Sequence, residues 1–130
     1  MNVPAVLRLK APDTWQPSTN LSETGVDALG SRDQAVIAEC LSPQQYADMH
    51  EQKQIAGVAF EKFTSSDTGA GNFYEITSYR AVRNGACIVL DEYIHSTNIG
   101  NYDPSQGIHE FDKPAVVNAL DEIIGTFTFK

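Results

Sequence analysis

Two histidines and several acidic residues occupy one stretch in the second half of the chain. Imidazole and carboxylate groups are side chains that ligate divalent metals and exchange protons with a substrate. This combination raises the hypothesis of a small-molecule, metal-binding or hydrolytic site. Its candidate ligand-binding residues are His95, Asp91, Asp103 and His109.

The spacing of these residues does not distinguish such a site from a solvated surface. Asp91 and Glu92 are adjacent on a predicted strand, so their side chains point to opposite faces and cannot chelate one ion together. His95 falls on the face of Asp91, a position that equally suits a hydrogen-bonded structural imidazole. No Gly-x-Ser-x-Gly nucleophile elbow is present. We therefore favour structural roles and assign no catalytic residue, metal or cofactor.

The glycine-rich string Gly69-Ala70-Gly71-Asn72 invites comparison with a phosphate-binding loop. A phosphate cradle needs a helix N-terminus directly after the glycines, whereas a strand is predicted here. The Gly-Lys-Ser/Thr ending of a P-loop is also missing. We predict a structural turn over residues 65–72.

The charge balance limits the classes of partner. The 130 residues carry 17 Asp and Glu against 9 Lys and Arg, a formal net charge of −8. Without basic clusters, such a chain is poorly suited to nucleic acid or to an anionic membrane surface, and it favours a basic protein or peptide. The length and the 42% hydrophobic content fit one globular domain over residues 1–130, expected as a monomer or weak dimer. No apolar run is long enough to cross a bilayer.

Two cysteines, Cys40 and Cys87, leave two alternatives open. They form no CxxC pair and lack zinc-finger spacing to any histidine. They are therefore either buried free thiols or a disulfide that closes a long loop. Composition does not decide between these alternatives.

The first half of the chain gives weak structural signals. Residues 3–9 predict an edge strand, residues 12–25 a loop and residues 25–29 a short strand. Residues 35–41 are ambiguous, because the nearby Ser31 and Gln34 mimic a helix capping box while the apolar residues alternate; we favour a strand.

A clearer signal follows at Ser42-Pro43-Gln44-Gln45, which is typical of a helix start and predicts a short helix over residues 43–50. Residues 55–63 then predict a strand. Residues 73–83 and 86–95 predict a β-hairpin, because Asn84-Gly85 between two β-rich runs is the strongest short-range hairpin signal.

The end of the chain predicts a loop over residues 96–110 and then an amphipathic helix. Asp112 is the expected N-cap, Pro114 lies in the first turn and Gly125 ends the helix. Its apolar stripe consists of Val116, Val117, Leu120, Ile123, Ile124 and Phe127. Residues 127–130 predict a final strand. The sum is an α+β fold: an antiparallel β-meander sheet packed against a C-terminal helix, with a short additional helix near 43–50.

Several strings of residues resemble a family of uncharacterised bacterial exported, lipoprotein-like domains. They are Thr19-Asn20-Leu21-Ser22-Glu23, Ala70-Gly71-Asn72 with Tyr74-Glu75 and Tyr79-Arg80, Ile94-His95-Ser96-Thr97-Asn98-Ile99-Gly100-Asn101-Tyr102, Phe111-Asp112-Lys113 and Thr126-Phe127. The similarity covers the chain from about Val3 to its end. The motifs are specific as strings, but they imply no known activity.

The resemblance implies a location in the bacterial periplasm or cell envelope, with a possible lipid anchor upstream of residue 1. Because oxidising compartments permit disulfides, it also favours a Cys40–Cys87 bond. Together with the acidic charge and the missing catalytic signatures, it predicts a non-enzymatic binding or interaction module.

Overall fold

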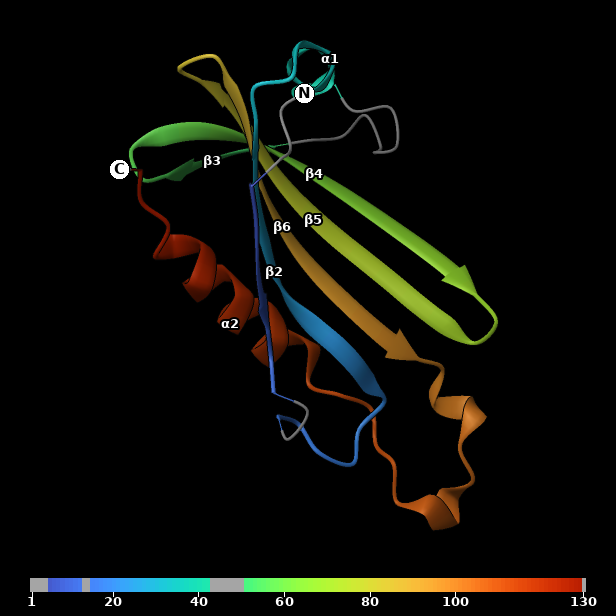
Figure 1. Ribbon diagram of the computed structural model, residues 1–130. Coiled ribbons are helices and arrows are strands. Elements are labelled where there is room, and N and C mark those ends of the chain that lie inside the picture. Colours follow the sequence, from blue (N-terminus) through green and yellow to red (C-terminus); the bar gives the residue numbers. More distant parts are fainter. Residues whose placement is uncertain (1–4, 13–14, 43–50, 130) are drawn as a thin grey trace.

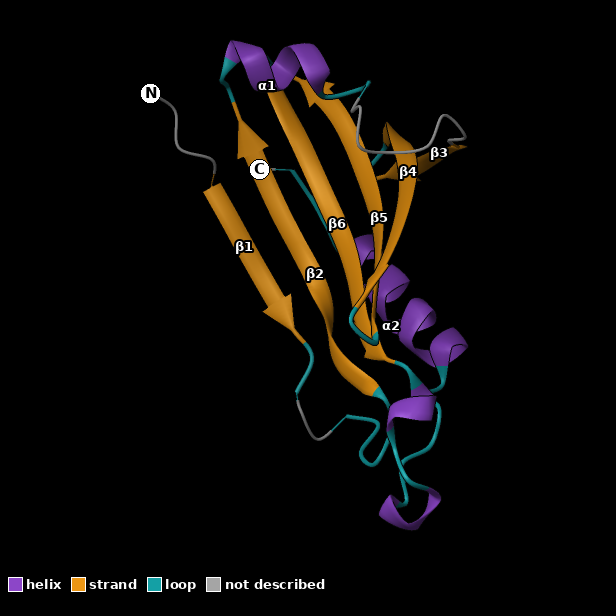
Figure 2. Cartoon of the chain, turned by 90° about the vertical axis from the view of Figure 1, so that its right-hand side faces the viewer, coloured by secondary structure: helices purple, strands orange, loops and turns teal. Residues whose placement is uncertain are grey.

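The computed structural model describes residues 5–12, 15–42 and 51–129 and has an α+β fold. Six antiparallel strands form one sheet in the order β1-β2-β6-β5-β4-β3, and helix α2 covers one face of it (Figures 1 and 2). The predicted fold class is therefore confirmed. None of the described helices is long and apolar enough to span a membrane.

Strands β3 to β6 follow one another as hairpins. Their bounds are Glu51–Ile55 for β3, Val58–Gly69 for β4, Asn72–Arg83 for β5 and Ala86–Thr97 for β6. Each connecting turn has two residues with φ between 51° and 79°, as type I′ turns require; they are Ala56-Gly57, Ala70-Gly71 and Asn84-Gly85. The Asn84-Gly85 hairpin is thus confirmed, and the glycines near position 70 serve a hairpin turn.

Two further strands complete the sheet. Strand β2 (Leu21–Ser31) pairs with β6, and β1 (Ala5–Lys10) pairs with β2 and forms the predicted edge. Strand β2 begins earlier than the predicted strand at 25–29, because residues 21–24 pair with the end of β6. A Cβ atom on Gly25 would lie 2.3 Å from the Leu9 carbonyl oxygen, so the contact between β1 and β2 requires glycine here.

The segment after β2 is helical, so the strand favoured for residues 35–41 is wrong. Helix α1 spans Gln34–Glu39, and Asp33 caps it by accepting a hydrogen bond from the Ala35 amide at 2.9 Å. The alternation was misleading because this short helix has no fully buried residue and therefore needs no apolar stripe. The helix predicted over residues 43–50 lies outside the described residues.

Helix α2 spans Lys113–Gly125 and has the predicted N-cap Asp112. Its buried residues Val116, Leu120 and Ile124 pack on the sheet. The sheet side of this core includes Val26, Ile55, Phe60, Tyr79, Ala81, Leu90 and Ile94. The helix covers the middle of the sheet and leaves the far end of the β4–β5 hairpin uncovered (Figure 1).

Three element boundaries differ from the predictions. The predicted strand over 55–63 is divided by the Ala56-Gly57 turn between β3 and β4. Most of the predicted turn over 65–72 is strand, because β4 continues to Gly69. Residues 127–129 form no strand; the rings of Phe127 and Phe129 instead pack against Phe60 at centroid distances of 6.4 and 6.2 Å.

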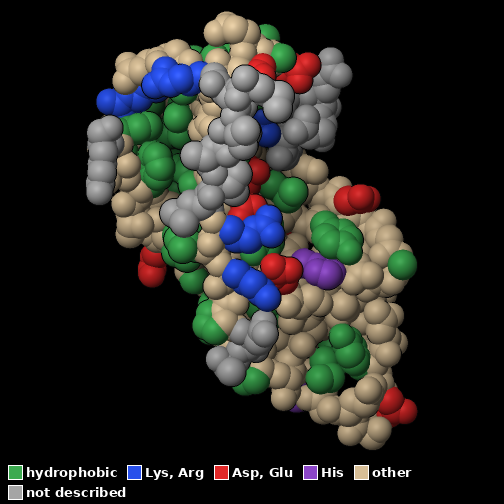
Figure 3. Space-filling view, in the orientation of Figure 1, with side chains coloured by type: hydrophobic (Ala, Val, Ile, Leu, Met, Phe, Trp, Pro, Cys, Tyr) green, Lys and Arg blue, Asp and Glu red, His purple; other side chains and the backbone are tan. Residues whose placement is uncertain are grey.

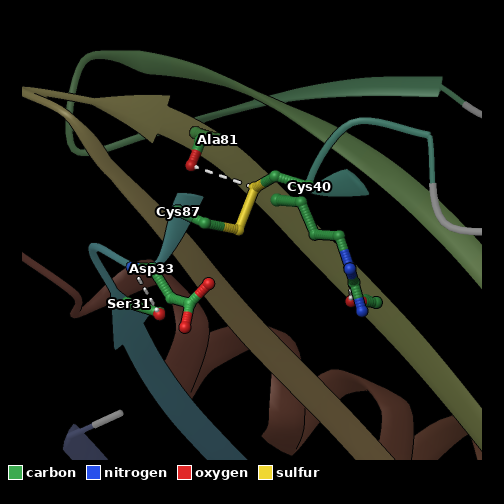
Figure 4. Close-up of a disulfide and its surroundings, with 7 residues drawn as sticks. Ser31, Asp33, Cys40, Ala81 and Cys87 are labelled. Carbon is green, nitrogen blue, oxygen red and sulfur yellow. Dashed lines mark hydrogen bonds between the residues drawn. A yellow bond between two sulfur atoms is a disulfide. The ribbon is translucent and has the colours of Figure 1, made fainter. Parts of the chain in front are cut away.

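Cys40 and Cys87 form a disulfide that joins the end of α1 to the start of β6 (Figure 4). Both cysteines are buried beside Val89 on the sheet face opposite α2. The predicted pairing is confirmed. Because 47 positions separate the two residues, the crosslink stabilises the fold by about 4 kcal/mol in the chain-entropy model.

Candidate binding groove

A pocket of about 580 Å³ lies between the β4–β5 hairpin and α2. Figure 1 shows the hairpin and the helix diverging on either side of β6. Side chains of Ile94, Val117 and Leu120 form an apolar wall. The hairpin contributes mainly polar residues: Thr64, Ser65, Ser66, Glu75, Ile76 and Thr77.

A second pocket of about 470 Å³ adjoins the first, since Ser66, Glu75 and Lys113 line both. Lys113 Nζ lies 2.5 Å from Glu75 Oε1, so this ion pair links the start of α2 to the hairpin at the junction. We call the two pockets together the acidic groove. Its charged lining, among the described residues, consists of Asp67, Glu75, Glu92, Glu110 and Lys113.

Asn20 holds the wall of the second pocket. Its buried side chain donates a hydrogen bond to the Thr97 carbonyl oxygen at 2.7 Å and accepts one from the Phe111 amide at 2.8 Å. The Asn20 amide also donates to the His109 carbonyl oxygen at 2.9 Å. Asn20 therefore connects the loop before α2 to the start of β2 and to the end of β6.

The tip of the β4–β5 hairpin is fixed from the other side. The Gly71 carbonyl oxygen accepts hydrogen bonds from the Asn98 amide at 2.9 Å and from Asn101 Nδ2 at 3.2 Å. Asn98 also caps the short 3-10 helix η1 (Ile99–Asn101). Because these contacts hold the hairpin in place, the groove is a preformed feature of the fold.

Glu92 is the most unusual side chain in the groove lining. It belongs to β6, is only 5% exposed, and its Oε2 has no hydrogen-bond partner among the described residues. Burial, together with hydrogen bonding and repulsion from Asp121 of α2, raises the pKa of Glu92 to about 8. The nearby Lys53 and Lys62 only partly oppose this shift. Glu92 is therefore mostly protonated at neutral pH.

The sequence-predicted candidates His95 and Asp91 lie on the sheet face opposite α2. His95 stacks on Tyr74 with a centroid distance of 4.4 Å, and its Nε2 is 2.9 Å from Asn72 Oδ1. Burial raises the pKa of Asp91, although the Ser78 hydroxyl and Arg80 oppose this effect. Asp91 and His95 are four positions apart on β6, which is about 13 Å along the strand.

The other two candidates lie in the loop before α2. Asp103 caps the 3-10 helix η2 (Pro104–Gln106), where hydrogen bonds from the Ser105 amide and hydroxyl lower its pKa. His109 is exposed and forms an isolated parallel bridge with Thr19. None of the four candidate residues lines either pocket of the groove. Within the part of the chain that the structure describes, no group of three His, Cys, Asp or Glu side chains could hold a metal ion.

The face shown in Figure 3 lacks a broad patch of one charge. Acidic and basic side chains adjoin one another there, and the visible hydrophobic side chains form small separate groups. Arg8 and Asp27 form an ion pair, with Nε and Oδ1 2.8 Å apart. The acidic groove is therefore distinguished by its concave shape together with its excess of carboxyl groups.

Sequence reasoning missed the groove, although one signal was present. On the α2 side of β4, Val58 and Phe60 are followed at the same two-residue period by Lys62, Thr64 and Ser66. This change from apolar to polar side chains on one face indicates that the strand leaves the core near residue 64. The partners across the groove come from α2, which is distant in sequence.

Comparisons with known proteins bear on the fold alone. No protein-family model matches the chain, and no curated protein is significantly similar in sequence. The structure is similar to the crystal structure of PA94 from Pseudomonas aeruginosa, a protein of unknown function described as a candidate regulator. The TM-score is 0.53 at 14% sequence identity, over 100% of this chain and 85% of that one.

Proposed function

We propose that the protein is a non-catalytic interaction module that binds a basic segment of a partner protein in the acidic groove. The charge of the groove lining is the observation that supports this most. Asp67, Glu75 and Glu110 line it together with Glu92, and its single described lysine, Lys113, is already paired with Glu75. A cationic segment complements this surface, whereas an acidic segment is repelled.

The shape of the groove fits the same class of ligand. Lysine and arginine side chains combine a long apolar stem with a charged end. The stem can pack on Ile94, Val117 and Leu120, while the charged end reaches the carboxylates of the second pocket. An extended peptide can place successive side chains in the two adjoining pockets.

The proposed location is the bacterial cell envelope, with a lipid anchor upstream of the chain. It rests on the resemblance to exported domains and is supported by the Cys40–Cys87 disulfide, since disulfides persist mainly in oxidising compartments. A partner there would meet the groove outside the cytosol.

A binding titration tests the proposal. The probe is a fluorescein-labelled peptide of alternating lysine and threonine, about eight residues long, titrated at low salt by fluorescence anisotropy. We expect saturable binding that weakens as salt is added. A peptide with glutamate in place of lysine should not bind.

Matched charge variants locate the binding site. The double variant Asp67→Asn/Glu110→Gln removes two charges from the groove, and we expect about three- to tenfold weaker binding. The control Glu39→Gln/Glu122→Gln removes two exposed charges outside the groove and should change affinity less than about twofold. Equal losses in both variants would mean that the peptide responds only to net charge, and the proposed function would be wrong.

A further inference from the structure

Strand β4 is longer than the strand that covers its outer edge. Strand β3 pairs only with residues 58–62 of β4, whereas β5 pairs with residues 61–69 on the other side. From Thr64 to Gly69, the outer edge of β4 therefore has no strand partner among the described residues. Thr64, Ser66, Asp67 and Thr68 are exposed there.

The backbone groups that face this open edge can be identified from the register. In an antiparallel ladder, the N–H and C=O groups of successive residues point alternately to the two neighbouring strands. Ile55 and Val58 are the paired residues that flank the β3–β4 turn, so the backbone N–H and C=O groups of Val58 point toward β3. The backbone groups of the other even-numbered residues of β4 point to the same side. By the same alternation, Thr64, Ser66 and Thr68 present their backbone groups to the open edge.

One of these amides already has a side-chain partner. The Thr68 amide donates to Asp67 Oδ1 at 2.9 Å, as expected for an amide that points away from β5. Among the described residues, no hydrogen bond occupies the outward amides of Thr64 and Ser66. These two residues offer donors and acceptors at the regular spacing of a strand.

The open edge borders the acidic groove. Thr64 lines the first pocket, Thr68 lines the second and Ser66 lines both. A strand that paired with this edge would direct every second side chain to the α2 side of the sheet, where the groove lies. Edge and groove therefore form one composite surface.

We propose that the basic segment binds as an added β-strand along Thr64–Thr68 of β4, with alternate lysine or arginine side chains directed into the acidic groove. This inference rests on the proposed function and names the binding mode. The backbone hydrogen bonds supply affinity that does not depend on sequence, and the alternate side chains supply selectivity.

Charge also selects the occupant of the edge. Natural proteins place charged residues on open edges to prevent pairing with other chains, and Asp67 has that position here. A second copy of this chain, whose net charge is −8, would bring further negative charge to Asp67 and Glu75. A strand with alternating basic residues meets no such repulsion.

Two variants of one residue test the pairing. Ser66→Pro removes the outward N–H and places a ring at the edge, and proline is tolerated on an edge strand whose N–H faces solvent. Ser66→Ala keeps the N–H and removes only the hydroxyl. With the lysine–threonine peptide, we expect Ser66→Pro to weaken binding about tenfold or more, and at least about threefold more than Ser66→Ala does.

N-methylated peptides give a second test that does not depend on how a variant folds. One peptide is methylated on its lysine amides and the other on its threonine amides. Only one of the two sets faces β4 in a paired strand, so one peptide should lose binding to the wild-type protein while the other keeps it. Equal binding of both methylated peptides, or wild-type affinity in Ser66→Pro, would overturn the pairing.

The outcomes separate this inference from the proposed function. If binding depends on Asp67 and Glu110 but not on the Ser66 amide, the groove binds basic peptides without strand pairing. If the unmodified peptide does not bind the wild-type protein at all, both proposals are wrong.

Discussion

Glu92→Gln should change how the stability of the protein depends on pH. Glu92 is 5% exposed, and its pKa is raised from 4.5 to about 8 in the folded protein. In the unfolded chain the carboxyl group has its ordinary pKa, so between these values the folded state binds more protons than the unfolded state. Stability from this group is fully present below about pH 4.5 and is lost as the pH rises through 8.

The size of the effect follows from the two pKa values. Each pH unit in this window costs up to 1.36 kcal/mol of unfolding free energy, and the cost levels off as Glu92 ionises in the folded state. The two values give a loss of about 3 kcal/mol between pH 5 and pH 8. Glutamine has nearly the same shape and does not titrate, so the variant should lack this loss.

Equilibrium urea unfolding at several pH values measures the unfolding free energy of wild type and variant. The contributions of the other titrating groups largely cancel when one free energy is subtracted from the other. The unfolding free energy of Glu92→Gln minus that of wild type should increase by about 3 kcal/mol from pH 5 to pH 8. Glu122→Gln, on the exposed side of α2, should run parallel to wild type. A parallel curve for Glu92→Gln would refute the account of a buried, proton-binding carboxyl group.

Two further predictions concern the structures that hold the groove and the sheet together. The variant Cys40→Ala/Cys87→Ala should lose about 4 kcal/mol of unfolding free energy in urea, because the unfolded chain regains the entropy of an open 47-position loop. A loss below about 1 kcal/mol would contradict that explanation. Asn20→Ala should cost about 2–4 kcal/mol, because the Thr97 carbonyl and the Phe111 amide both lose their partner. The exposed control Asn118→Ala should change the Tm by little, and equal Tm values for the two variants would contradict the role of Asn20.

The second half of the fold was predictable because its local signals agree with its long-range packing. Asn84-Gly85 favours the turn it adopts, and the apolar stripe of α2 has the period of a helix whose one face is buried. The turn at Ala56-Gly57 escaped prediction for the converse reason, and the turn at Ala70-Gly71 was predicted only as part of a longer turn over residues 65–72. Alanine rarely adopts positive φ, so tertiary pairing of the strands, and not local preference, determines its conformation there.

The groove could not be predicted because its residues come from elements that are adjacent only after folding. Lys113 and Glu75 are 38 positions apart, and Glu92 gains its raised pKa from burial and from Asp121, neither of which has a local sequence pattern. The cluster around His95 was conspicuous in sequence, yet Asp91 and His95 lie four positions apart along β6, and Asp103 and His109 lie in the loop before α2. Proximity in sequence was a poor guide to proximity in space.

The most direct test of the proposed function is an NMR titration of the wild-type protein with the lysine–threonine peptide. The account predicts that the largest changes in amide chemical shift occur along the acidic groove, at residues such as Ser66, Glu75 and Lys113. Residues on the opposite sheet face, such as Tyr93, should change little. Shifts centred on that opposite face, or no shifts at all, would contradict the claim that the groove binds a basic partner.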